Sequence, residues 1–143
     1  RFIPNLIGFD PNSDKADIQE RFDSDFVDRY KHSFDSAFSI CALHFVTLDY
    51  FSQRVLEFKN IIKPGGRGYL ALNLARMIED APEKKNTDYL LDLFGSINPD
   101  TQQVKQYIEN EINELKLDLV MSKVDFTIYD EYINGNIILV FNA

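Results

Sequence analysis

The chain is poor in the residues that build cross-linked or metal-bound frameworks. Its 143 residues include one cysteine, Cys41, and no tryptophan. A single cysteine excludes an internal disulfide and a cysteine-rich metal site. The simplest expectation is therefore a reducing compartment, the cytoplasm.

Basic residues are also scarce, with 15 Lys and Arg against 23 Asp and Glu and a formal net charge of -8. This balance disfavours nonspecific attraction to the phosphates of nucleic acid. The sequence contains no apolar run long enough to span a membrane and no secretory leader pattern. Its length fits one domain over residues 1–143. The chain opens at Arg1 in a strand-like run, and we expect it to be part of a longer domain.

The most regular stretch reads as a strand, a helix and a second strand. Ala37–Ala42 is a short apolar run, typical of a parallel strand that is covered on both faces. Apolar residues then recur at helical spacing over residues 51–62. Pro64 ends the helix, and Gly65-Gly66 supplies a turn with positive φ before the next strand. Together these patterns predict one βαβ unit.

Three short motifs mark this unit. They are Phe34-Asp35 at the start of the first strand, Leu43-His44 after it, and Lys63-Pro64-Gly65-Gly66-Arg67 before the second strand. In this order they resemble the class I S-adenosylmethionine-dependent methyltransferases. The resemblance implies an α/β fold with helices on both faces of a Rossmann-like sheet, mostly parallel with an antiparallel C-terminal hairpin. It also implies S-adenosylmethionine as cofactor and methyl transfer as the reaction.

Asp10 is the first expected cofactor contact. It closes a short apolar strand predicted over Leu6–Phe9. In nucleotide-binding βαβ folds a carboxylate at such a strand end accepts hydrogen bonds from ribose hydroxyls. The alternative is that Asp10 starts an Asx turn before Pro11.

The resemblance implies further cofactor contacts. Ser39, Ile40 and Cys41 should lie beside the bound cofactor, and Asp17 or Asp23 should approach the adenine amino group. The distance from Asp10 to Phe34 is too short for the third strand that the family has at this point, because a whole crossover needs a dozen or more residues on its own.

His44 is the candidate catalytic residue, because it follows the strand whose end should lie beside the cofactor. Histidine titrates near neutrality and could act as a base or orient the methyl acceptor. A structural role is the alternative. Methyl transfer depends mainly on positioning, so no catalytic dyad is required.

Residues 79–99 form an insertion after the second strand, and the resemblance implies that it is part of a substrate lid. No Asn/Asp-Pro-Pro-Tyr run of the amino-methylating nucleic-acid enzymes is present. Together with the acidic balance, this favours a small molecule or a protein as methyl acceptor over nucleic acid.

The C-terminal part begins with a helix that Asp100 and Gln103 should cap as a capping box. Two strands are then predicted over Leu119–Tyr129 and Asn136–Phe141. The Asn134-Gly135 dipeptide between them indicates a hairpin turn.

The main departure from the family is a missing element. Its members carry a glycine-rich loop after the first strand of the domain, and this chain has none. The first hypothesis is therefore a methyltransferase domain without its N-terminal strand and helix. The second is a methyltransferase-like interaction or scaffold domain that binds no cofactor, and a nicotinamide-dependent enzyme is a distant third. A sheet edge left open by a missing strand would invite pairing between copies, so a homo-oligomer is expected as one outcome.

Overall fold

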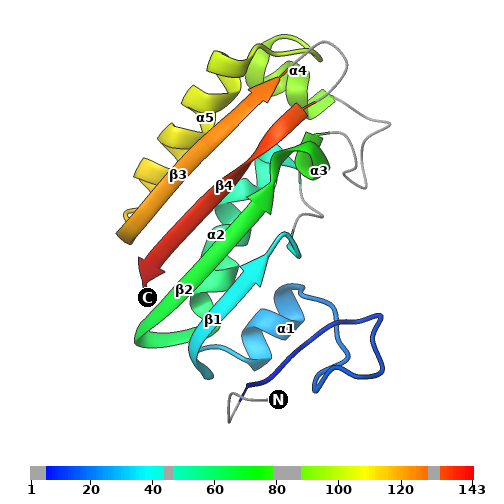
Figure 1. Cartoon of the computed structure of the whole chain (residues 1–143), viewed down its shortest axis with the longest axis vertical. Helices are drawn as coiled ribbons and strands as arrows, with labels where there is room; N and C mark the ends of the chain where they lie inside the picture. The colour runs from blue at the N-terminus through cyan, green and yellow to red at the C-terminus, as the bar shows by residue number, and fades with distance from the viewer. Residues whose placement is uncertain (1–5, 44–46, 79–87, 129–132) are drawn as a thin grey trace.

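The computed structural model describes residues 6–43, 47–78, 88–128 and 133–143. These residues form an α/β fold, as predicted (Figure 1). Its elements are, in chain order, α1 (Ser24–Arg29), β1 (Phe34–Ile40), the short 3-10 helix η1 (Leu48–Tyr50), α2 (Phe51–Asn60), β2 (Ile62–Asn73), α3 (Leu74–Ile78), α4 (Asp88–Phe94), α5 (Thr101–Glu114), β3 (Asp118–Ile128) and β4 (Ile133–Asn142).

The four strands form one open, mixed sheet in the order β1-β2-β4-β3. β1 and β2 run parallel and are connected through α2, so the predicted βαβ unit is confirmed. β4 lies antiparallel between β2 and β3. The sheet therefore has β1 at one edge and β3 at the other (Figure 1).

The glycines after α2 fit β2 closely against β1. α2 ends at Asn60, before Pro64 as predicted, and Gly65 has a φ of +86°. A Cβ on Gly66 would lie 2.2 Å from the carbonyl oxygen of Asp35 in β1. β2 already begins at Ile62, so the glycine turn lies inside the strand rather than before it.

The predicted position of the C-terminal turn is wrong. Asn134 and Gly135 lie inside β4, paired with Thr127 and Phe126 of β3. The physical reason is a close approach, because a Cβ on Gly135 would lie 2.2 Å from the Cβ of Phe126. The connection between the strands falls on residues 129–132, outside the described residues.

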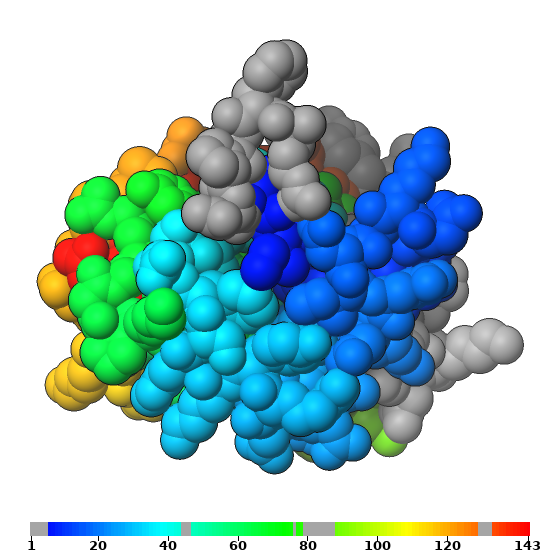
Figure 2. Space-filling view, turned by 90° about the horizontal axis from the view of Figure 1, so that it is seen from below, coloured from blue at the N-terminus to red at the C-terminus, as the bar shows by residue number. Residues whose placement is uncertain are grey.

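From residue 6 onward, where the described part of the chain begins, the N-terminal segment does not join the sheet. The strand expected over Leu6–Phe9 is reduced, in the described residues, to a single bridge between Phe9 and Ile18. Neighbouring aromatic rings connect this segment to β1, with centroid distances of 4.7 to 5.8 Å; they belong to Phe9, Phe22, Phe26, Tyr30 and Phe34. Figure 2 shows the N-terminal segment at the lower end of the molecule, next to α1 and β1.

The two faces of the sheet differ. α2 and α5 lie on one face (Figure 1), and the side chains between them and the strands are fully buried. Among these are Phe51, Val55, Phe58, Leu72, Val104, Ile108, Ile137, Leu139 and Phe141. On the opposite face Phe38, Ile40 and Tyr69 are 59%, 71% and 44% exposed. Within the described residues, the expectation of helices on both faces is therefore not met.

Candidate functional site

The candidate site is the edge of the sheet where the parallel strands end. β1 ends at Ile40 and β2 at Asn73, and open α/β sheets bind their ligands at the carboxyl ends of such strands. β4 places Asn136 directly opposite Asn73 in the register. The Sγ atom of Cys41 lies 4.0 Å from Oδ1 of Asn136. Residues from β2, β4 and the segment after β1 thus meet at this edge.

Cys41 turns the chain out of the sheet. Its φ is +54°, in the left-handed region that costs a non-glycine residue roughly 1–2 kcal/mol. Its backbone N–H still donates to the carbonyl oxygen of Ala71, at 2.8 Å. The thiol is therefore held at the carboxyl edge, beside Asn136, instead of continuing the alternation of the strand.

Ser39 carries a buried polar group at the end of β1. The residue is 8% exposed, and it pairs in register with Leu70, which faces the helices. Among the described residues its hydroxyl oxygen has no hydrogen-bond partner. An unsatisfied buried group costs about 1–3 kcal/mol. A ligand that supplies a hydrogen bond here would recover that free energy.

Ser39, Ile40 and Cys41, the three expected contacts on β1, thus have different surroundings. Ser39 faces the helices, Ile40 lies on the opposite face, and Cys41 lies at the edge between them. Of these three residues, Ser39 and Cys41 present polar side-chain atoms next to the strand ends, and Ile40 does not. The predicted contact of these residues with a cofactor stays a prediction.

Asp10 and Asp17 close a loop of the N-terminal segment. The Oδ1 atom of Asp10 accepts a hydrogen bond from the N–H of Asn12 at 2.8 Å, which is the Asx turn of the alternative interpretation. Asp17 accepts one from the N–H of Gly8 at 2.7 Å. In Figure 1 this segment lies beside α1, lower in the view than the tip of β1. The structure therefore brings Asp10 and Asp17 together but not to the edge where β1 ends, and their cofactor roles stay predictions.

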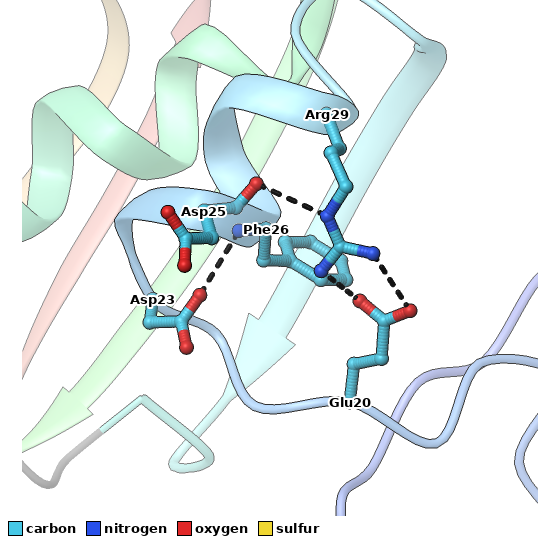
Figure 3. A network of polar contacts seen from close by, with 5 residues as sticks. All are labelled: Glu20, Asp23, Asp25, Phe26 and Arg29. Carbon is cyan, nitrogen blue, oxygen red and sulfur yellow. Dashed lines mark hydrogen bonds and ion pairs between the residues drawn. The ribbon is translucent and has the colours of Figure 1, made fainter.

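Asp23, the alternative to Asp17, belongs to a polar network around α1 (Figure 3). Its side chain caps the helix by accepting from the N–H of Phe26 at 2.9 Å. Arg29 donates to both carboxylate oxygens of Glu20, at 3.0 and 2.5 Å, and its Nε donates to the carbonyl oxygen of Asp25. The hydrogen bond with Glu20 raises the pKa of Arg29. The contact with Phe26 gives Asp23 a structural role in helix capping, and its approach to the adenine amino group stays a prediction.

His44, the candidate base, lies outside the described residues, which resume at Thr47. The first part of the expected lid, residues 79–87, also lies outside them. The described remainder of the lid includes α4, where the hydroxyl of Tyr89 donates to the carbonyl oxygen of Met77 at 3.3 Å. The catalytic role of His44 and the lid role of residues 79–99 stay predictions.

Tyr107 of α5 anchors the short helix η1, which follows β1 in the chain. The sequence had not indicated a role for this residue. Its hydroxyl donates to the carbonyl oxygen of Leu48 at 3.3 Å. Burial, and to a lesser degree the charges of Glu111 and Asp49, raise the pKa of Tyr107 to about 12. The signal in the sequence was its place beside Ile108 on the apolar stripe of the helix.

Asn136 was also missed, because the Asn-Gly dipeptide before it indicated a turn at that point. The groups that gather at the edge, from Ser39, Cys41, Asn73 and Asn136, are uncharged. They suit hydrogen bonding to a polar ligand rather than proton transfer.

Residues 6–43, 47–78, 88–128 and 133–143 contain no group of three His, Cys, Asp or Glu side chains that could hold a metal ion. None of the helices described is both long enough and apolar enough to cross a bilayer.

The chain matches no protein-family model, no curated protein and no solved structure. Its function is therefore inferred from its own residues and geometry.

Proposed function

We propose that the chain is part of an S-adenosylmethionine-dependent methyltransferase domain that acts on a small-molecule or protein acceptor. The observation that carries the proposal is the strand arrangement. A parallel pair joined through α2 is followed by α5 and by an antiparallel hairpin. This is the C-terminal arrangement that the motifs around Asp35, His44 and Lys63-Pro64-Gly65-Gly66 imply.

The carboxyl edge of β1 and β2 is the proposed cofactor site. The buried hydroxyl of Ser39, without a partner in the described part of the chain, supports this placement because a bound ligand would satisfy it. When bound, S-adenosylmethionine supplies a methyl group on a sulfonium. The residues of this chain would position the cofactor and the acceptor and keep water away, which is most of what such a displacement needs.

The first test is calorimetric titration of S-adenosylhomocysteine into the full-length protein. Ser39→Ala is the decisive variant, because it removes a hydroxyl that has no hydrogen-bond partner among the described residues. We expect the free protein to keep or raise its unfolding temperature. Cofactor binding should weaken by about five-fold to 150-fold, because the variant loses the roughly 1–3 kcal/mol that the cofactor recovers by satisfying the hydroxyl. Ser36→Ala, on the exposed first half of the same strand, is the matched control and should change neither quantity.

Asp10 is tested in the same titration. If its carboxylate binds the ribose, Asp10→Ala weakens binding by roughly ten-fold to a hundred-fold. Asp10→Asn, which keeps an acceptor for the N–H of Asn12, separates the ribose contact from the Asx turn. Asp14→Ala, at another exposed carboxylate of the same loop, is the control.

No binding by a folded, full-length protein would overturn the methyltransferase proposal. The alternative function is an interaction or scaffold domain that binds no cofactor. One specific observation favours it: the carboxylate of Asp10 accepts from the N–H of Asn12, and the segment that contains both lies beside α1, lower in the view than the tip of β1 (Figure 1). Under this alternative Ser39→Ala changes only the stability of the protein.

A further inference from the structure

One face of the sheet presents an apolar surface that the described helices leave uncovered. This open face is formed by Phe38 and Ile40 of β1, Tyr69 of β2, Ile138 and Val140 of β4, and Met121 of β3. Phe38 and Ile40 are more than half exposed, and Met121 is 45% exposed. Contiguous exposed apolar patches mark interaction sites, and parallel strands are normally covered on both faces.

The apolar residues are continuous across the sheet. The register pairs Phe38 with Tyr69, Tyr69 with Val140 and Val140 with Met121, which makes one row over all four strands. The half of this row on β1 and β2 is aromatic, and the half on β4 and β3 is aliphatic. A two-fold axis parallel to the strands, between β2 and β4, would place the aromatic half of one copy on the aliphatic half of the other. The row is therefore complementary to itself.

The charges of the open face are balanced. Its rows include Arg67, Asp118, Lys123 and Asp125, two positive and two negative side chains that sum to zero. Asn142 accepts from Arg67 and donates to Asp118, both at 3.2 Å, and Lys123 lies 3.6 Å from Asp125. The whole chain has a net charge of -8. The face therefore adds no net repulsion between two acidic copies, and it has no net charge to attract a highly charged partner.

We propose that the open face is the interface of a homodimer in which a second copy of this chain packs sheet against sheet. Sheets packed in this way lie about 10 Å apart, with their side chains interdigitated. Strand and residue spacings give the face, from the row of Arg67 to the row of Asn73, a flat area of roughly 400 Å². A standard interface buries about 800 Å² on each partner, so the dimer is weak. The methyltransferase family has helices on both faces of its sheet, so under the proposed function another part of the full-length protein would cover this face. The dimer therefore belongs with the scaffold alternative, and a full-length protein that binds S-adenosylhomocysteine but stays monomeric overturns the dimer and not the methyltransferase proposal.

Analytical ultracentrifugation of the full-length protein over a range of concentrations tests the interface. We expect dimer at about 100 µM and monomer at about 1 µM, as is usual for an interface at the small end of the range. Tyr69→Glu should make the protein monomeric throughout. Leu56→Glu is the matched control, because Leu56 of α2 is exposed to a similar extent and lies on the helix side of the sheet. It adds the same charge and should leave the dimer unchanged.

A second variant separates face packing from pairing along the edge of β1. Met121 lies on β3, at the other edge of the sheet from β1. Met121→Glu therefore dissociates a dimer formed by the open faces, but it leaves intact a dimer formed by pairing of two β1 strands. Added salt should not dissociate the proposed dimer, since it screens the repulsion between two acidic chains.

The proposal is overturned if the wild-type protein remains monomeric at about 100 µM. It is also overturned if Met121→Glu dimerises like the wild type, or if Leu56→Glu dissociates the dimer as much as Tyr69→Glu. Thermal unfolding of each variant at low concentration shows that it is folded. All three substitutions are at exposed side chains, so we expect unfolding temperatures close to that of the wild type.

Discussion

The two faces of the sheet use the same strands and yet differ in almost every physical respect. On the covered face Leu72, Leu139 and Phe141 are fully buried under α2 and α5. On the open face Phe38 and Ile40 have more than half of their surface exposed. Side chains alternate along a strand, so each strand supplies both surfaces. The hydrophobic character of a strand therefore does not show whether one or both of its faces are buried.

The difference lies in what covers each face. On the covered face, α5 is amphipathic and packs its buried residues Val104, Ile108 and Ile112 toward the strands. Burial of apolar surface stabilises a fold by about 25 cal/mol per Å². The open face gains that stabilisation only when another surface is added, which is what the proposed dimer supplies. The predictions below compare the two faces, from the largest expected effect to the smallest.

The largest difference is expected between two phenylalanines. Phe141 is fully buried and packs edge to face on Phe58, with ring centroids 6.3 Å apart. Phe141→Ala should lower the free energy of unfolding by about 3–5 kcal/mol, because it removes a core ring and leaves a cavity. Phe38→Ala, on the open face, should lower it by about 1 kcal/mol or less. Urea unfolding at low protein concentration, where the dimer is absent, measures both.

The contrast between the faces would be lost if the two substitutions cost the same at that concentration. An effect of Phe38→Ala that grows with protein concentration, while that of Phe141→Ala stays constant, would link the open face to dimerisation.

The second prediction concerns the packing of Gly68 under Phe141. A Cβ on Gly68 would lie 2.5 Å from Cζ of the Phe141 ring. Gly68→Ala should therefore destabilise the protein by about 1–3 kcal/mol through overpacking. Adding Phe141→Leu, which shortens the side chain above it, should recover part of that loss. The double-mutant cycle measures the coupling, and strict additivity of the two substitutions would contradict the contact.

Much of the covered face could be predicted from local patterns. The apolar spacing of α2, the capping box of Asp100 and Gln103, and the positive φ of Gly65 all appear in the structure. Each of these depends on residues a few positions apart. The open face could not be predicted in this way, because the apolar run of β1 indicates a buried strand whether or not a second layer exists.

The candidate site shows the same limit. The place where Ser39 and Cys41 lie follows from the end of a predicted strand. The lack of a partner for the Ser39 hydroxyl among the described residues depends on how other elements pack around β1. The neighbour of Cys41, Asn136, comes from β4, far along the chain. Gly135 shows why, since its approach to Phe126 overrides the turn that Asn134-Gly135 favours locally.

The third prediction concerns a substitution at the start of α5. It should loosen this helix, which covers one face of the sheet, without changing the strands. The carboxylate of Asp100 accepts from the N–H of Gln103 at 2.9 Å, and the Gln103 side chain accepts from the N–H of Asp100 at 3.1 Å. Asp100→Ala should lower the free energy of unfolding by about 1 kcal/mol. Hydrogen exchange should accelerate first in the amides at the start of α5. Gln102→Ala, at an exposed position of the same helical turn, is the control and should have little effect.

The smallest effect on stability is expected from Tyr107, whose hydroxyl connects α5 to η1. Its pKa is raised to about 12 in the folded protein, mainly by burial, whereas an unfolded tyrosine titrates near 10. Below pH 10 the side chain is neutral in both states and its contribution to stability is fully present. As the pH rises from about 10 to 12 the unfolded chain loses this proton first, so stability falls. The size of the fall is reduced by solvent, because the side chain is only partly buried.

Tyr107→Phe tests this assignment, because it removes the titrating group and keeps the ring beside Phe94. We expect the variant to lose less stability than the wild type between pH 10 and 12, measured by urea unfolding. It should be slightly less stable near pH 7, where the hydrogen bond to Leu48 is lost. Tyr69→Phe on the open face is the comparison. If the two variants have the same dependence on pH in this window, the covered layer does not perturb Tyr107, and the two faces are electrostatically alike at these positions.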